Sequence, residues 1–159
     1  MPELPEVETV RRGLADLLPG QAVVRATVFD SPKSFPNSPT DVQQFLYGAH
    51  VTAVRRRAKV LMIDLDTRYS LVIHLKMTGQ LIFRGANSFA GGHPNDSLIG
   101  ELPDRSTRVQ IDFADGSHLF FNDQRKFGWM KLMPTDEIEN LPFMQKVGPE
   151  PLDKKTEAG

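Results

Sequence analysis

The chain has 159 residues, of which 40% are hydrophobic and 25% charged, so we expect one globular domain and exclude a mainly disordered chain. It has no cysteine and no close ligand spacing among its four histidines, which excludes a disulfide framework, a thiol nucleophile and a thiolate zinc site and predicts no metal in this chain. The formal net charge of −1 does not indicate a nucleic-acid partner, but residues 1–84 carry 11 basic and 8 acidic residues, so a positive surface would be local.

The first 47 residues predict two helices with a strand between them. Apolar residues at helical spacing predict an amphipathic helix that starts near Leu4 and ends at Pro19-Gly20. Residues 21–29 are rich in β-branched side chains and predict a strand, and Thr40-Asp41 offers a cap for a short helix that runs through Tyr47. The N-terminus lacks a secretory signal and no apolar run approaches the roughly 18 residues of a membrane span, so we expect a cytoplasmic protein.

From His50 onward, short segments rich in Val, Ile and Leu are joined by tight turns, a pattern typical of antiparallel strands. The predicted strands cover residues 50–57, 59–66, 69–76, 79–84, 107–114, 117–122 and 128–133. Together with residues 21–29 they make about eight strands, which are too closely spaced for crossover helices. The sequence therefore predicts a mainly β fold with flanking helices, an antiparallel β-sandwich with an N-terminal amphipathic helix.

Two segments fall outside this pattern. Residues 85–106 are rich in Gly and Pro, show no periodicity and are predicted to form a long loop that is either functional or mobile. Near the C-terminus, a short helix is predicted over residues 136–141, followed by Gly148-Pro149-Glu150-Pro151 and a charged tail. We therefore expect one domain over residues 1–148 and the start of a linker over residues 149–159.

The N-terminus carries an unusual set of reactive groups. If Met1 is removed, Pro2 becomes a secondary amine beside the carboxylates of Glu3 and Glu6, and a terminal amine has a reference pKa of about 7.7–8.0, far below that of Lys. Condensed with an aldehyde carbon, this amine is held as a cationic iminium, which is an electron sink. Glu3 and Glu6 would lie on one side of the first helical turn, where one could move protons. The alternative is structural, because acidic residues and Pro are common at helix starts.

The run Arg55-Arg56-Arg57-Ala58-Lys59 is the second candidate. In a strand, Arg55, Arg57 and Lys59 would share one face and so offer a row of cations to phosphate groups. The same row fits a solvated sheet edge, where Lys and Arg are favoured. Both interpretations stay open on the sequence alone.

The third candidate is a pair of turns that carry apolar side chains next to a cation. Met77 precedes Thr78-Gly79, and Phe127 follows Arg125 and Lys126 between two predicted strands. Apolar groups on loops can replace base stacking in an opened duplex while a cation fills the hydrogen-bonding gap. Packing under the loops is the more common reason for Met and Phe. His74, shortly before Met77, could bind phosphate or be an internally satisfied histidine.

These residues belong to five motifs that closely resemble, in order, segments of the bacterial formamidopyrimidine-DNA glycosylases. The N-terminal motif is Met1-Pro2-Glu3-Leu4-Pro5-Glu6-Val7-Glu8-Thr9-Val10-Arg11-Arg12-Gly13-Leu14. The later motifs are Arg56-Arg57-Ala58-Lys59, His74-Leu75-Lys76-Met77-Thr78-Gly79, Asn122-Asp123-Gln124-Arg125-Lys126-Phe127-Gly128 and Gly148-Pro149-Glu150-Pro151-Leu152. Five ordered motifs across essentially the whole chain are far more specific than any one of them.

The resemblance implies a bifunctional base-excision enzyme. It would bind damaged double-stranded DNA, remove oxidised purines such as 8-oxoguanine and formamidopyrimidines, and nick the strand at the abasic site. By the same resemblance Pro2 is the Schiff-base nucleophile, Glu3 the proton donor and Glu6 a supporting carboxylate. Lys59 would be the proton donor associated with β-elimination.

The resemblance also implies which residues contact DNA, namely His74, Met77, Arg125, Lys126 and Phe127. Three of them, Met77, Arg125 and Phe127, would fill the gap left by a flipped nucleotide, with Arg125 facing the orphaned base. We expect a monomer that has no membrane partner.

Family members are longer and continue with a helix–two-turn–helix domain and a four-cysteine zinc finger. The resemblance therefore implies no cofactor in this chain, one structural zinc in the remaining part, and poor or no activity of these 159 residues alone. Ser106 stands where the family tends to place a DNA-contacting His, and Gln124 and Lys126 replace a more usual Pro and Arg. Two alternatives stay open: an oxidised-pyrimidine glycosylase of the related endonuclease VIII group, and a sandwich that only binds damaged DNA or packs on a partner domain.

Overall fold

The computed structural model describes residues 3–29, 32–142 and 144 of the chain. In chain order its elements are α1 (Leu4–Leu17), β1 (Val23–Val28), η1 (Pro32–Ser34), α2 (Pro39–Phe45), β2 (Val51–Arg57), β3 (Val60–Leu65), β4 (Tyr69–His74), β5 (Gly79–Arg84), β6 (Ser88–Gly92), η2 (Asp96–Leu98), β7 (Thr107–Phe113), β8 (His118–Asp123), β9 (Trp129–Pro134) and η3 (Thr135–Asn140), where η marks a 3-10 helix. No helix in the described ranges is long and apolar enough to cross a membrane.

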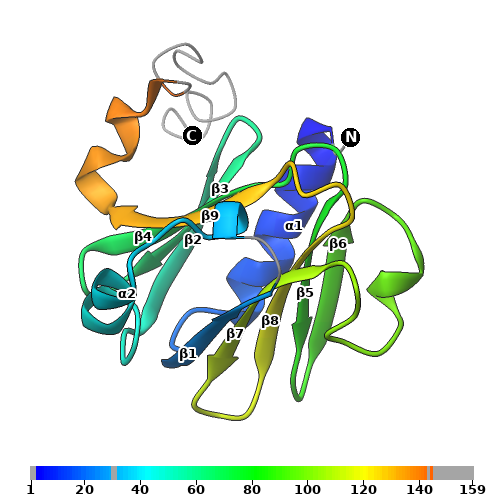
Figure 1. The fold of residues 1–159 in the computed structure, drawn as a ribbon, viewed down its shortest axis with the longest axis horizontal. Coiled ribbons are helices and arrows are strands. Elements are labelled where there is room, and N and C mark those ends of the chain that lie inside the picture. Colours follow the sequence, from blue (N-terminus) through cyan, green and yellow to red (C-terminus); the bar gives the residue numbers. More distant parts are fainter. Residues whose placement is uncertain (1–2, 30–31, 143, 145–159) are drawn as a thin grey trace.

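The strands form two antiparallel sheets that pack on each other (Figure 1). The five-stranded sheet has the order β1-β7-β8-β5-β6, and the four-stranded sheet has the order β2-β3-β4-β9. Buried side chains of both sheets meet in one core, among them Leu61, Leu71, Leu81, Val109 and Phe121. This mainly β sandwich with an N-terminal helix confirms the predicted fold class.

Helix α1 packs along one open side of the sandwich. Val7, Val10 and Leu14 recur every three or four residues and are buried, so they form the stripe that faces the sheets. The helix contacts β2 and β6, which are the outermost strands of the two sheets (Figure 1). Because α1 touches both sheets, its position fixes the N-terminal residues relative to the rest of the sandwich.

Two glycines allow α1 to approach β6 closely. A Cβ atom on Gly91 would lie 2.7 Å from Cγ2 of Val10, and a Cβ atom on Gly13 would lie 2.3 Å from the ring of Phe89. The Val10 methyl group cannot move away easily, because a β-branched side chain in a helix has one strongly preferred rotamer. A side chain at position 91 would therefore push the helix away from the sheet.

We expect Gly91→Val to lower the free energy of unfolding by about 1–3 kcal/mol, because extra methyl groups in a packed contact force their neighbours out of low-energy rotamers. Ala90→Val is the matched control, since Ala90 is exposed on the same strand and a β-branched residue suits a strand. Urea unfolding of the two variants measures the difference. Equal stability of both would contradict the close approach of α1 and β6.

The segment predicted as one long loop, residues 85–106, contains β6 and η2. Strand β6 pairs with β5 in antiparallel register, and it lacks the apolar alternation that identifies a strand in a sequence. The residues after it lie against the five-stranded sheet, where Gln80 Nε2 donates to His93 O at 2.6 Å and Arg84 Nη2 donates to Leu98 O at 3.3 Å. The prediction of one long loop over residues 85–106 was therefore wrong.

The two predicted short helices differ in detail from the structure. The cap of α2 is Ser38, whose Oγ accepts a hydrogen bond from Asp41 N at 3.2 Å, so the predicted cap at Thr40-Asp41 was wrong. The predicted helix at residues 136–141 is the 3-10 helix η3, and its Ile138 packs with Met62 and Val72 in a second apolar cluster. The predicted linker, residues 149–159, lies outside the described residues.

Candidate functional site

Three connections that carry the predicted site residues lie at one end of the sandwich (Figure 1). The β2–β3 turn carries Lys59, the β4–β5 connection carries Met77, and the β8–β9 connection carries Arg125 and Phe127. Strand pairing brings them together, because Val60 pairs with His74, His74 pairs with Trp129, and Gly79 pairs with Asp123. The last two connections both pass from one sheet to the other, side by side.

Glu3 and Lys59 approach each other between the start of α1 and the β2–β3 turn. Lys59 Nζ lies 3.7 Å from Glu3 Oε2, and both side chains reach solvent. Pro2, the predicted nucleophile, lies outside the described residues, and Glu3 is the residue next to it. An ammonium group beside a carboxylate is a pair that can exchange protons with a bound substrate.

Glu6 has a structural contact. Its Oε1 accepts a hydrogen bond from Glu3 N at 3.4 Å, which satisfies a free N–H group at the start of α1. Glu3 and Glu6 together form a capping box at the start of α1, and the Glu3 carboxylate also faces Lys59. The position of Glu6 therefore favours a role in orienting Glu3 over direct contact with a substrate.

His74 is a neutral hydrogen-bond donor at the edge of this group. Burial, which is the largest cause, and the charges of Lys76 and Lys59 together lower its pKa to about 4. Its Nδ1 accepts a hydrogen bond from Lys76 N at 3.1 Å, so the single ring proton belongs on Nε2. His74 can therefore donate to a phosphate oxygen but adds no positive charge at neutral pH.

The predicted row of cations on β2 is not a free phosphate-binding row. Arg55 donates to both carboxylate oxygens of Asp64, at 2.5 and 2.9 Å, and this contact raises the Arg55 pKa above its usual value. Arg57 forms an ion pair with Glu139. Lys59 follows the end of the strand, because Ala58 takes a backbone φ of 51° and starts the turn. The prediction that Arg55, Arg57 and Lys59 share one strand face was therefore wrong.

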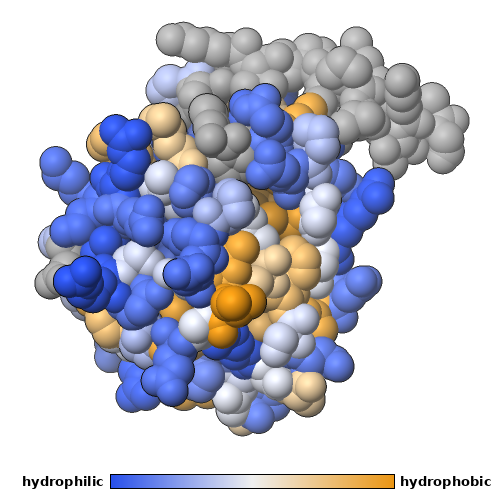
Figure 2. Space-filling view, turned by 90° about the vertical axis from the view of Figure 1, so that its right-hand side faces the viewer, coloured by the Kyte–Doolittle hydropathy of each residue, from blue (hydrophilic) through white to orange (hydrophobic). Residues whose placement is uncertain are grey.

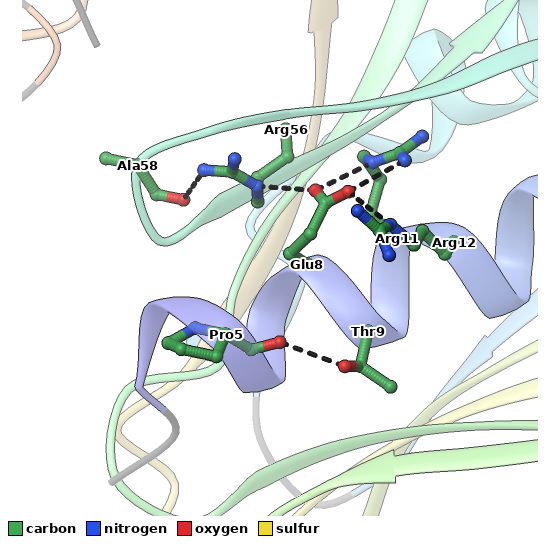
Figure 3. Close-up of polar contacts among 7 residues, drawn as sticks. All are labelled: Pro5, Glu8, Thr9, Arg11, Arg12, Arg56 and Ala58. Atoms are coloured by element: carbon green, nitrogen blue, oxygen red, sulfur yellow. Dashed lines mark hydrogen bonds and ion pairs between the residues drawn. The ribbon is translucent and has the colours of Figure 1, made fainter. Parts of the chain in front are cut away.

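Arg56, on the opposite face of β2, joins the helix to the turn that carries Lys59 (Figure 3). Its side chain is 4% exposed, its Nε donates to Glu8 Oε1 at 2.8 Å, and its Nη1 donates to Ala58 O at 3.0 Å. In Figure 3, Arg56 lies between Glu8 on α1 and Ala58 in the turn. This bridge fixes the distance between the two elements that bear Glu3 and Lys59.

Glu8 is the acceptor at the centre of that bridge. It also accepts from Arg11 Nε and Nη2, both at 2.9 Å, and from Arg12 Nε at 2.8 Å (Figure 3). The bond from Arg11 is the largest cause that lowers the pKa of Glu8 to about 2, helped by Arg56 and Arg12 against the opposing effect of burial. The sequence analysis missed this role, although Arg11 and Arg12 stand three and four residues after Glu8, the spacing of helical ion pairs.

Met77, Arg125 and Phe127 form a row of exposed side chains. Met77 is 42% exposed and Phe127 51% exposed, so the alternative that they pack under the loops was wrong. Arg125 lies between them, with Nη1 3.7 Å from Met77 Sδ and its guanidinium carbon 4.8 Å from the centre of the Phe127 ring. Lys126 is exposed beside this row with a backbone φ of 60°. The structure thus brings two exposed apolar side chains together with a cation between them.

Ser106 turns its side chain inward beside a cavity of about 380 Å³ lined by Ser97, Asp104, Arg105, Ser106, Arg108 and Gln124. Ser106 Oγ donates to Asp104 Oδ1 at 2.7 Å, and Ser106 is 7% exposed. Burial opposes the ionisation of Asp104, but hydrogen bonds from Ser97 and Ser106 hold its pKa below the usual value. Within the described part of the chain, no group of three or more His, Asp or Glu side chains could hold a metal ion.

Comparison with protein families gives one match for most of the chain. Residues 1–130 match the family model described as the formamidopyrimidine-DNA glycosylase N-terminal domain. Relatives named formamidopyrimidine-DNA glycosylase include the protein of Jannaschia sp., 42% identical over 154 residues, and that of Dinoroseobacter shibae, 39% identical over 152 residues. Both alignments cover 96% of this chain and 52% of the relative, so the chain spans about half the length of the curated relatives it matches.

Solved structures of a Lactococcus lactis protein are similar in fold. The wild-type Fpg (MutM) in complex with DNA that contains N7-benzyl-Fapy-dG superposes with a TM-score of 0.76 at 29% identity, covering 94% of this chain and 50% of that chain. The formamidopyrimidine DNA glycosylase from the same organism, bound non-covalently to DNA with an AP site, superposes with a TM-score of 0.75 at 29% identity and covers 94% and 52% of the two chains. The sandwich is thus similar to about half of each of these DNA-bound proteins.

Proposed function

The chain belongs to the formamidopyrimidine-DNA glycosylase family, and from this membership we propose that it supplies the catalytic domain of a base-excision repair enzyme. The enzyme would bind damaged double-stranded DNA, remove oxidised purines such as 8-oxoguanine and formamidopyrimidines, and then nick the strand as an abasic-site lyase. The observation that carries the proposal is the approach of Lys59 to Glu3 at 3.7 Å, next to the N-terminus and at the same end of the sandwich as the exposed row.

The proposed chemistry begins with Pro2 once Met1 has been removed. The Pro2 nitrogen forms a bond to C1′ of the damaged nucleoside while the glycosidic bond breaks, and the departing base takes up a proton that Glu3 is placed to donate. The proton of the Pro2 nitrogen then passes to the ring oxygen O4′, the C1′–O4′ bond breaks to leave a hydroxyl group, and C1′ remains as a cationic iminium. The iminium makes the C2′ proton acidic, and loss of that proton breaks the C3′–O bond and releases the 3′ phosphate. No step requires a metal or an oxidant.

Lys59 and Glu6 are proposed to support these steps. Lys59 would move a proton during elimination and lie near a DNA phosphate, since its side chain is 34% exposed and its ammonium group lies beside Glu3. Glu6 would hold Glu3 through the contact with its backbone N–H group. The Glu8–Arg56–Ala58 contacts keep α1 and the Lys59 turn together, so the two proton-transfer groups arrive in one place.

The proposed DNA contacts divide between phosphate and base. His74 and Lys126 would contact phosphate groups, His74 through Nε2 as a neutral donor. Met77, Arg125 and Phe127 would enter the space left by the flipped nucleotide, where apolar tips replace lost stacking and the guanidinium group faces the orphaned base. Contact through Ser106 is not part of the proposal, because its hydroxyl group is committed to Asp104.

We further propose that residues 1–148 form the catalytic sandwich and that residues 149–159 begin a linker. The structural zinc that the family resemblance implies would be held outside these 159 residues, because they contain no cysteine. The protein is expected to act as a monomer.

Borohydride trapping on duplex DNA with one abasic site tests the proposal. With the full-length natural protein after removal of Met1, reduction of the iminium is expected to give a covalent protein–DNA product, and peptide mapping is expected to place the cross-link on Pro2. Pro2→Gly is expected to abolish that cross-link. Binding of abasic duplex without any trapped product would contradict the proposal and favour a sandwich that only binds damaged DNA.

A further inference from the structure

We propose that the buried Asp123 is a positioning residue that holds the two loops bearing Met77, Arg125 and Phe127 in one fixed arrangement. The inference rests on the proposed function, because it concerns how these exposed side chains enter a DNA duplex. It assigns a role to a residue that contacts no DNA itself, since Asp123 is 0% exposed.

The Asp123 carboxylate accepts hydrogen bonds from both loops. Its Oδ1 accepts from the Thr78 hydroxyl group, in the β4–β5 connection that carries Met77, and from Arg125 N at 3.2 Å. Its Oδ2 accepts from Gly128 N at 2.5 Å, at the far end of the β8–β9 connection that carries Phe127. One buried carboxylate therefore joins the bases of the two loops.

The backbone of Asp123 is held in turn by the neighbouring strand. Arg108 Nε donates to Asp123 O at 2.9 Å, and Asp123 N donates to Ser106 O at 2.8 Å. Arg108 is itself 5% exposed, so this support lies inside the protein. The carboxylate thus sits on a fixed part of the five-stranded sheet rather than on a free loop.

Close backbone packing keeps the loop bases rigid. A Cβ atom on Gly128 would lie 2.8 Å from His74 O and 3.0 Å from Asp123 Oδ2, which leaves no room for a side chain. Thr78 Oγ1 also accepts from Arg125 N at 3.2 Å, so the two loops are bonded to each other as well as to Asp123. The tips are exposed while their bases are fixed, an arrangement that avoids ordering the loops when they enter DNA.

A carboxylate fits position 123 because every group that is hydrogen-bonded to this side chain is a donor. The Thr78 hydroxyl group and the two backbone N–H groups all point hydrogen atoms at Asp123. An asparagine has one acceptor oxygen and an NH₂ group, so at least one N–H or O–H donor would face another donor. The role therefore depends on the charge and both oxygens of Asp123, not only on its size.

The test compares three variants on two DNA substrates with the full-length natural protein. Thr78→Val removes the hydroxyl group while keeping the shape, Thr78→Ser keeps the hydroxyl group, and Asp123→Asn keeps the size of the side chain. Thr52→Val is the matched control, because Thr52 is exposed on β2. The substrates are an 8-oxoguanine duplex, in which a gap must be filled, and a single-stranded abasic oligonucleotide, in which there is no gap.

We expect Thr78→Val and Asp123→Asn to slow excision from the duplex by about ten-fold or more, because displaced loops no longer enter the gap together. Nicking of the single strand should stay within about two-fold of the unsubstituted protein, since the groups at the N-terminus are untouched. Thr78→Ser, which keeps the hydroxyl group, should excise 8-oxoguanine from the duplex at about the rate of the unsubstituted protein. The fluorescence of 2-aminopurine placed beside the lesion should report the same loss of insertion.

Three outcomes would overturn the inference. An equal loss on both substrates would mean that Asp123 and Thr78 only stabilise the fold, and an unchanged duplex rate for Thr78→Val would mean that the loops need no such anchor. If Asp123→Asn does not fold, the two Thr78 variants decide the question. Failure of the unsubstituted protein to nick either substrate would instead overturn the proposed function, and the inference with it.

Discussion

Replacing Glu3 by Gln is expected to lower the rate of base excision by about 10²–10⁴-fold, the range that a positioned proton donor contributes. The amide has nearly the shape of the carboxylic acid but cannot deliver a proton to the departing base. It also loses the charge that attracts Lys59 across 3.7 Å. Single-turnover excision of 8-oxoguanine from duplex DNA by the full-length natural protein measures the effect.

The two halves of the proposed reaction should respond differently to this substitution. A preformed abasic site needs no base protonation, so Glu3→Gln should still give a borohydride-trapped product on abasic DNA. Glu137→Gln is the control, because Glu137 is an exposed acidic residue on η3 and is not one of the candidate site residues. Full excision by Glu3→Gln would assign the proton donor to another residue, and loss of trapping together with excision would indicate that Glu3 also acts on the amine.

Removing the carboxylate of Glu8 is expected to cost about 3 kcal/mol of unfolding free energy, the largest stability effect that we predict. Glu8→Ala takes away the ion pair between Glu8 and Arg56, whose side chain is 4% exposed, and breaking a buried ion pair by removing one partner is strongly destabilising. Asp16→Ala is the matched control, because Asp16 is an exposed acidic residue on the same helix. Urea unfolding at neutral pH measures both variants, and equal stabilities would contradict the role of the bridge.

The same carboxylate predicts how stability depends on pH. The pKa of Glu8 is about 2 in the folded protein and 4.5 in the reference state, so the folded state binds a proton less readily than the unfolded state. Its contribution, about 2–3 kcal/mol, is present above pH 4.5 and is lost as the pH falls toward 2. Unfolding measured from pH 6 to pH 2 should show this loss, and Glu8→Ala should flatten that part of the curve.

Local sequence patterns predict most helices and strands of the fold, but they do not predict which elements pack against each other. Apolar spacing at Val7, Val10 and Leu14 predicts α1, and the Val- and Ile-rich runs predict the strands that the structure contains. Strand β6 was not predicted, because it is only partly buried and contains Gly91 and Gly92. These glycines allow close approach by α1 and β5, but they do not give the alternating apolar pattern of a strand. Its place depends on tertiary contacts that no local pattern contains.

The candidate site was predicted as a set of residues, while its supports were not. Motifs identified Glu3, Lys59, Met77, Arg125 and Phe127. The structure places Glu3 at the start of α1 beside Lys59, and the other four residues on connections at one end of the sandwich. The predicted row of free cations was not found, because Lys59 lies in the turn after β2, Arg55 pairs with Asp64 on the neighbouring strand and Arg57 pairs with Glu139 on η3. The supports at Arg56 and Asp123 depend on contacts between elements far apart in sequence, which periodicity does not reveal.

The position of α1 also bears on how the protein avoids aggregation. The outermost strand of a sheet has unpaired N–H and C=O groups, which can recruit a strand from another molecule. Helix α1 contacts β2 and β6, which are edge strands of the two sheets. A single helix therefore covers an edge strand of each sheet, where another molecule could otherwise add a strand. Damage to its packing would uncover both together, and a variant such as Gly91→Val should precipitate on heating before it loses its strands.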